Sequence, residues 1–199
     1  MSRLEGFLDL FSERTSYSLI EGVRQKDEDA WNSLNQLYAP LVAYWCQKAG
    51  VPADDVEDLV QDVFRAVMRG VEDFRKQSEQ GSFRSWLWVI TRRKVIDFFK
   101  VRRGKAIAAG GTDAQFHIQQ LPESEPAEDY TTFGPEEGLA HRALKIVESE
   151  IKETTYKAFW RSTIDDVSPA VVAEELGISV DSVYQAKSRV LKRLRELLY

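Results

Sequence analysis

The chain of 199 residues has few of the side chains that build disulfides or metal centres: one cysteine, Cys46, and two histidines. A single thiol cannot form an internal disulfide, and its apolar neighbours predict a buried, reduced side chain. The sequence also lacks a run of eighteen apolar residues, and no basic stretch followed by a long apolar one stands at its start. We therefore expect a cytoplasmic protein without membrane insertion.

Alternating apolar and polar residues, the pattern of a half-buried strand, do not persist anywhere in the chain. Apolar residues instead recur at steps of three and four, which predicts an all-α fold. Residues 104–137 are rich in glycine, proline and acids and predict a flexible acidic linker. The chain thus divides into two helical domains, residues 1–103 and 138–199.

The net charge of −5 argues at first against a nucleic-acid partner, but the distribution of charge reverses this impression. Eight Lys and Arg residues and a single acid, Asp97, lie between Ser82 and Lys105. Five more, with no acid, lie between Ser182 and Arg195. Two basic stretches in an acidic chain indicate two nucleic-acid contacts.

The segment from Asp54 to Val71 carries one apolar helical stripe and, on its far side, an acidic ridge of Asp55, Asp58 and Asp62. The ridge fits a docking surface. A solvated face that complements the helix dipole explains most of this pattern, and for this helix alone we favour that interpretation. A nuclease metal site is a weaker alternative, because ligands at this spacing on one outward face do not converge.

A further helix is predicted from Ser82, a suitable N-cap. We expect one stripe of it, Phe83, Leu87, Ile90, Phe98 and Val101, to face the core. A second face mixes aromatic rings with guanidinium groups, a combination that suits unpaired DNA, although its rings could equally pack on a neighbouring helix. That face holds Trp88, Arg92, Val95, Phe99 and Arg103.

Upstream, the apolar stripe from Ala30 to Trp45 predicts a core helix that Pro40 should kink or restart. Residues 4–11 form a short amphipathic segment that is either frayed or packed on the domain.

The C-terminal part contains the pattern of a helix-turn-helix. Ser168 and Pro169 begin a short apolar helix, Gly177 ends it, and a longer basic helix follows Ser179. Such a second helix enters the major groove. Its early exposed residues are then candidates for base edges, namely Asp181, Ser182, Tyr184, Gln185 and Ser188, and its bases are candidates for phosphates, namely Lys187, Arg189, Lys192 and Arg193.

With these residues in view, most of the chain resembles a sigma factor of the extracytoplasmic-function type, a compact group within the bacterial sigma-70 family. Three stretches carry the resemblance: Asp55-Val-Glu-Asp-Leu-Val-Gln-Asp-Val-Phe64, Gly81-Ser-Phe-Arg-Ser-Trp-Leu-Trp-Val-Ile-Thr-Arg92 with Val95-Ile-Asp97, and Ala173-Glu-Glu-Leu-Gly-Ile-Ser179 with Lys192-Arg-Leu-Arg-Glu-Leu-Leu198.

The resemblance implies a role for each stretch. The first would bind the clamp helices of the largest polymerase subunit through Asp55, Asp58, Gln61 and Asp62. The second, with the loop from Phe74 to Gly81 that captures a flipped base, would melt and hold the minus-ten element. Its implied contacts are Arg75, Lys76, Arg84, Trp88, Arg92, Arg93, Phe99 and Arg103. The C-terminal domain would touch the polymerase flap and bind the minus-thirty-five element through Asp181, Ser182, Tyr184, Gln185, Ser188, Arg189 and Lys192.

Two positions depart from the family pattern. Arg93 stands where the family usually has Asn, and Asp181-Ser-Val-Tyr-Gln-Ala186 replaces a more basic start of the recognition helix. The upstream promoter sequence should therefore differ from common family promoters. We expect a non-enzymatic initiation factor without cofactor or metal, whose partners are core RNA polymerase and promoter DNA. The resemblance also admits an anti-sigma factor as a partner, and a stand-alone helix-turn-helix regulator is the main rival.

Overall fold

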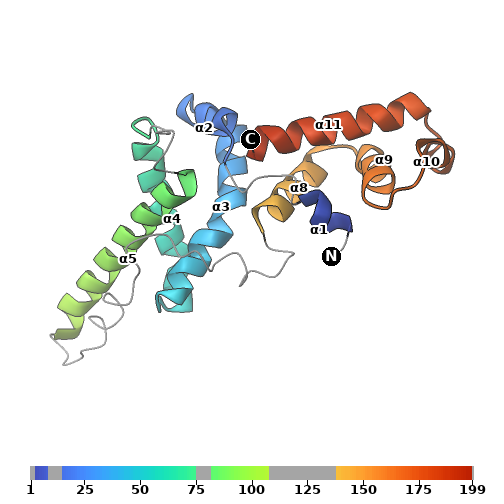
Figure 1. Cartoon of the computed structure of the whole chain (residues 1–199). Helices are drawn as coiled ribbons and strands as arrows, with labels where there is room; N and C mark the ends of the chain where they lie inside the picture. Colours follow the sequence, from blue (N-terminus) through green and yellow to red (C-terminus); the bar gives the residue numbers. More distant parts are fainter. Residues whose placement is uncertain (1–2, 9–14, 75–81, 108–137, 199) are drawn as a thin grey trace. The chain divides into compact units, whose positions relative to one another are not determined.

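The computed structural model describes residues 3–8, 15–74, 82–107 and 138–198, the last five of the third range by their backbone alone. Every regular element in these ranges is a helix (Figure 1), which confirms the predicted all-α fold. The chain divides into two compact units, residues 22–129 and residues 1–21 together with 130–199. Most of the predicted linker, at 108–137, lies outside the described residues.

The first of these units contains α3 (Glu28–Lys48), α4 (Ala53–Gly70) and α5 (Phe83–Ile107), which pack against one another. The carboxylate of Asp27 caps α3 by accepting the Ala30 backbone N–H at 3.0 Å. α3 continues through Pro40 as one helix, so the predicted restart does not occur. Edge-to-face packing of Trp45 in α3 on Trp88 in α5, with ring centroids 5.2 Å apart, joins these helices.

α5 buries Phe83 and Leu87 as predicted, but the rest of its core face differs from the prediction. Trp88 and Phe99 are 3% and 5% exposed, whereas Val101, predicted as core, is 63% exposed. Two apolar stripes interleave on this helix, and the buried one also includes Thr91, whose hydroxyl donates to the Leu87 carbonyl at 2.8 Å. A polar residue satisfied within its own helix can enter a core, and counting apolar residues alone misses it. α5 also extends to Ile107, four residues beyond the predicted domain end, because Lys105 and Ala106 are good helix formers.

The second unit is built from α8 (Leu139–Glu150), α9 (Glu153–Thr163), α10 (Pro169–Leu176) and α11 (Val180–Leu198). α11 packs on each of the other three helices. The guanidinium of Arg193 in α11 pairs with Glu150 of α8 at 2.6 Å. Buried residues of α9, α10 and α11 form one cluster where these helices meet: Ala158, Val172, Ala173, Val183 and Ala186.

The beginning of the chain belongs to this second unit. Phe7 of α1 (Arg3–Leu8) packs edge to face on Phe159, with ring centroids 5.6 Å apart. Ser16 precedes α2 (Tyr17–Arg24), and its hydroxyl caps that helix by accepting the Leu19 N–H at 3.0 Å. The prediction assigned residues 1–21 to the first domain. It was wrong there because local periodicity carries no information about a partner near the other end of the chain.

Candidate docking surface and nucleic-acid interface

The acidic ridge lies on the exposed side of α4. Val56, Leu59 and Val63 are buried on the opposite side, so the predicted apolar stripe holds this helix against its neighbours. Asp58 and Gln61 are exposed, and Asp55 and Asp62 are partly so. The four candidate docking residues therefore share one accessible face.

The contacts within this face differ from residue to residue. The guanidinium of Arg65 forms an ion pair with Asp62 and donates a hydrogen bond to the side-chain carbonyl of Gln61 at 3.2 Å. Asp55 accepts a hydrogen bond from Arg102 of α5 at 2.6 Å. Asp58 has no ion-pair or hydrogen-bond partner among the described residues. In the same ranges, no three His, Cys, Asp or Glu side chains gather in a way that could hold a metal ion.

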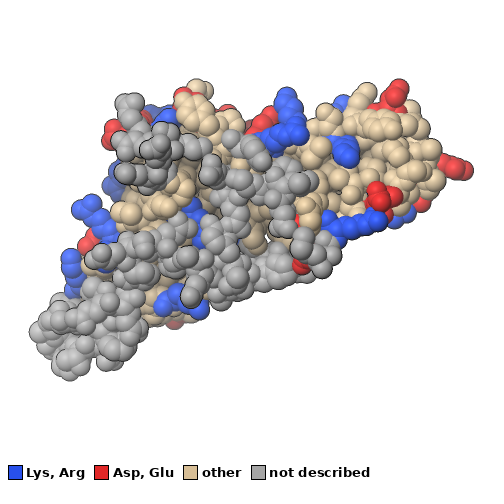
Figure 2. Space-filling model, viewed as in Figure 1, with Lys and Arg blue, Asp and Glu red and all other residues tan. Residues whose placement is uncertain are grey.

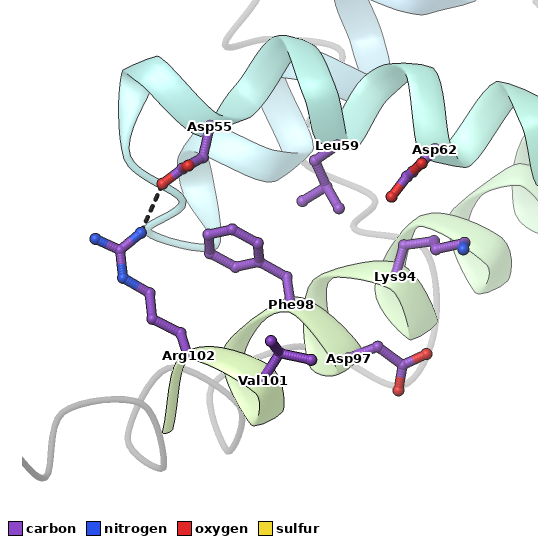
Figure 3. A pocket seen from close by; sticks show the side chains of 8 residues that line it. All are labelled: Asp55, Leu59, Asp62, Lys94, Asp97, Phe98, Val101 and Arg102. Carbon is purple, nitrogen blue, oxygen red and sulfur yellow. Dashed lines mark hydrogen bonds and ion pairs between the residues drawn. The ribbon is translucent and has the colours of Figure 1, made fainter. Parts of the chain in front are cut away.

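A pocket of about 470 Å³ opens between α4 and α5, beside the ridge. Figure 3 shows Leu59, Phe98 and Val101 pointing into it, with the pair of Asp55 and Arg102 at one end. Asp62, Lys94 and Asp97 complete the lining. This pocket was not predicted from the sequence, because Phe98 and Val101 were both expected to face the core.

The candidate minus-ten contacts on α5 fall into two groups. Trp88, Phe99 and Arg84 are buried, with Arg84 stacked over the ring of Trp45 at 5.8 Å. The rings of Trp88 and Phe99 therefore offer no free face to a base, and the predicted stacking by these two residues is corrected. Arg93 is exposed and Arg92 partly exposed. Arg75, Lys76 and the side chain of Arg103 lie outside the described residues.

A different tryptophan has an accessible face on α5. Trp86 is half-buried, packs on Phe74 and Phe83, and lies so close to Gly70 that a Cβ added there would come within 3.1 Å of its ring. Together with Arg69 and Arg93 it lines a cavity of about 560 Å³. The spacing of Trp86 and Arg93, seven residues apart on one helix, was the signal in the sequence that could have found this arrangement.

The predicted helix-turn-helix is present in the second unit. Ser168 caps α10, Pro169 occupies its first turn, and Gly177 ends it in the left-handed region at φ 63°. The Ile178 N–H then donates to the Ala173 carbonyl at 3.0 Å, and the Ser179 hydroxyl accepts the Ser182 N–H at 3.1 Å at the start of α11. These contacts fix the turn between the two helices, as a helix-turn-helix requires.

α11 buries Val183, Ala186 and Val190 and turns its polar residues outward. Tyr184 is 57% exposed. The other candidate base and phosphate contacts are exposed or partly so: Asp181, Ser182, Gln185, Lys187, Ser188, Arg189 and Lys192. Figure 2 shows Lys and Arg side chains standing out from the surface of each unit.

Arg193 does not belong to that outward set. Its guanidinium is held by two oxygens of Glu150, at 2.6 and 2.7 Å, and this contact raises the pKa of the guanidinium. The prediction that Arg193 contacts phosphates is therefore corrected, because the side chain already joins α11 to α8.

Several known proteins that are similar to this chain are sigma factors. Residues 34–105 match the Sigma-70 region 2 family, which spans most of α3, all of α4 and most of α5. The sigma factor NccH of Alcaligenes xylosoxydans is 31% identical over 49% of this chain and only 51% of its own length. The ECF sigma factor RpoE of Cereibacter sphaeroides is 26% identical over 93% of this chain and 96% of its own length. The ECF sigma-E factor of Escherichia coli is 25% identical over 85% of this chain and 81% of its own length.

Residues 34–105 therefore form a sigma-70 region 2 domain, and over most of its length the chain is similar to ECF sigma factors. The match at 34–105 covers the acidic ridge and α5, the two features that carry the first two of the resembling stretches. The relatives are named as RNA polymerase sigma factors, which supports a sigma factor role for this chain. The third stretch, in α10 and α11, lies beyond that match.

A solved structure, CnrH in complex with the cytosolic domain of CnrY, matches 88% of this chain and 92% of that chain, with a TM-score of 0.37 and 20% identity. Among the described helices of this chain, none is both long and apolar enough to span a membrane.

Proposed function

We propose that this sigma factor docks on the clamp helices of the largest polymerase subunit through the α4 ridge, opens promoter DNA with α5, and binds the minus-thirty-five element with α11. The proposal rests on one observation: the outward face of α4 is acidic, whereas the outward face of α11 is polar and basic. These two faces belong to different units, so acidic docking and basic DNA contact do not compete for the same residues.

The recognition helix supports the upstream part of the proposal. Tyr184 and Gln185 lie in the first half of α11, where residues of a helix-turn-helix meet base edges. Arg189 and Lys192 lie one and two turns further, where phosphates pass. Contact of this domain with the polymerase flap is part of the same proposal.

The α5 region supports promoter opening in a modified form. Because Trp88 and Phe99 are buried, we assign base stacking to Trp86 and phosphate contact to Arg93. No step requires a cofactor or catalysis by this chain, since the polymerase performs the chemistry.

The docking claim is tested by replacing Asp58 and Asp62 together with Asn and measuring the affinity for core RNA polymerase. We expect binding at least about tenfold weaker, because charged rim residues steer and hold the partner. Glu57→Gln is the control for one lost charge at an exposed position of the same helix, and the two-charge variant should lose more than twice the binding free energy that this control loses. Equal affinity of the Asn variant and the control would overturn the docking role of the ridge.

A stand-alone helix-turn-helix regulator remains the second candidate, favoured only by α10 and α11. It predicts promoter binding that polymerase does not influence.

A further inference from the structure

In this structure, the carboxylate of a proposed docking residue on α4 forms an ion pair with an arginine of α5. Asp55, on the α4 ridge, pairs with Arg102 of α5, with Oδ2 and Nη1 2.6 Å apart. The same guanidinium lies over the ring of Phe98, 5.7 Å from its centroid. Arg102 is therefore bound by a carboxylate and an aromatic face together, which is how arginine anchors are held at protein interfaces.

The pair closes one end of the pocket between α4 and α5. Behind it, Leu59, Phe98 and Val101 form an apolar floor that the long aliphatic part of an arginine or lysine side chain can cover (Figure 3). Val101 is 63% exposed, so this floor is accessible from outside. The pocket has a volume of about 470 Å³, enough for one such side chain and part of its neighbour.

The charge of the lining selects a cationic occupant. Without Arg102, the pocket holds three carboxylates, Asp55, Asp62 and Asp97, and one ammonium group, Lys94. Arg65, which pairs with Asp62 from outside the pocket, leaves the rim with a net negative charge. A negative rim around an apolar floor complements a side chain with an aliphatic stem and a positive tip, whereas it repels phosphate.

We propose that this pocket receives an arginine side chain of the polymerase clamp, that Arg102 holds Asp55 at one end of the pocket in the free chain, and that docking exchanges one guanidinium for the other on Asp55. The inference rests on the proposed docking of the α4 ridge. Its consequence is a coupling: once displaced from Asp55, Arg102 becomes available to the DNA phosphates together with the exposed Lys100. The free chain then has one DNA contact fewer than the docked chain.

The exposure of the pair makes the exchange feasible. The side chains of Arg102 and Asp55 are 54% and 39% exposed, and ion pairs so accessible to water contribute little to stability. An incoming arginine replaces a contact of the same kind, so the two arrangements are close in free energy, and binding of the partner decides between them.

The first experiment measures the affinity of the full chain for a fluorescent single-stranded oligonucleotide, without polymerase. Asp55→Asn releases Arg102, so we expect binding several-fold tighter and a salt dependence steeper by about one phosphate contact. Glu57→Gln changes the charge equally on the same helix, and its smaller effect sets the baseline. The double variant Asp55→Asn/Arg102→Gln should lose the gain. A gain that equals the Glu57→Gln baseline, or that survives in the double variant, would overturn the proposal.

The second experiment measures binding to core polymerase. Arg102→Gln removes the internal competitor and should tighten binding, while Phe98→Ala removes the ring beneath the guanidinium and should weaken it severalfold. Circular dichroism during heating confirms that each variant folds. If Asp58→Asn/Asp62→Asn weakens binding but neither Phe98→Ala nor Arg102→Gln changes it, the ridge docks and the pocket does not. If all these variants bind as the unmodified chain does, the docking role of the ridge fails as well.

Discussion

The backbone N–H of Ser16 donates to the carbonyl of Leu197 at 3.2 Å and so joins the start of the chain to its last helical turn. The Ser16 hydroxyl donates to the neighbouring carbonyl of Glu196, and the residue is completely buried. Phe7 adds its contact with Phe159, itself 0% exposed. The N-terminal segment is therefore part of the core of the unit that contains the helix-turn-helix.

Phe7→Ala should destabilise that unit. Removing a buried phenyl ring costs about 3 kcal/mol, so amide hydrogens of α9 and α11 should exchange roughly a hundredfold faster. Arg3→Ala is the control, because the ion pair of Arg3 with Asp166 has side chains 64% and 70% exposed, and such pairs contribute less than about 1 kcal/mol. Unchanged exchange in Phe7→Ala would mean that α1 does not stabilise the unit.

Trp88→Ala should lower the stability of the first unit by about 3 kcal/mol or more, because its ring packs on Trp45 in the core. Thermal unfolding followed by circular dichroism measures the loss, and Trp88→Phe should recover part of it. A Trp88→Ala variant that unfolds at the original temperature yet fails to open promoters would restore the direct DNA role.

Trp86→Ala should affect promoter opening more than closed-complex formation. Its ring lines an accessible cavity beside Arg93, and stacking contributes about 1–3 kcal/mol per base. Permanganate reactivity of unpaired thymines reports opening, and gel retardation at low temperature reports the closed complex. Equal losses in the two assays would indicate a purely structural tryptophan.

The contrast between these two tryptophans shows what the sequence determines. The turn of the helix-turn-helix was predictable because Ser168, Pro169 and Gly177 each have a strong local preference for a cap, a first turn and a left-handed position. The acidic ridge followed equally from helical spacing. The orientation of α5 was not predictable, because two stripes of similar apolar content compete and the choice depends on Trp45 in another helix.

Pairings across the chain were beyond local patterns for the same reason. The contacts of Arg193 with Glu150 and of Arg102 with Asp55 join separate helices. The sequence shows only that these residues are charged, so Arg193 was assigned to phosphate and Arg102 was counted only in the first basic stretch. Long-range partners decide which cations remain available to DNA.

Substitutions on α11 should separate sequence reading from general attraction. Gln185→Ala should change discrimination at one base pair by about 1–3 kcal/mol. Lys192→Ala should weaken all sequences alike and reduce the salt dependence by about one contact. Binding of the polymerase complex to a library of upstream sequences measures both. A Gln185→Ala variant with the original preference would show that α11 reads DNA with other residues.

Stability should fall with pH in the alkaline range through Cys46. Burial raises the pKa of its thiol to about 12, whereas an unfolded cysteine has a pKa of about 8.5. The folded state therefore keeps its proton longer, and stability present below pH of about 8.5 is lost as pH rises towards the folded pKa, by up to about 1.4 kcal/mol per unit. Urea unfolding between those limits should show a steeper loss for the unmodified chain than for Cys46→Ala. Parallel pH profiles would contradict the burial of this thiol.

Run-off transcription by core RNA polymerase, with and without the chain, on a fragmented genomic library from the source bacterium tests the central claim most directly. The account predicts specific new transcripts that appear only with the chain and that disappear with Asp58→Asn/Asp62→Asn but persist with Glu57→Gln. Absence of new transcripts, together with absence of polymerase binding, would contradict it.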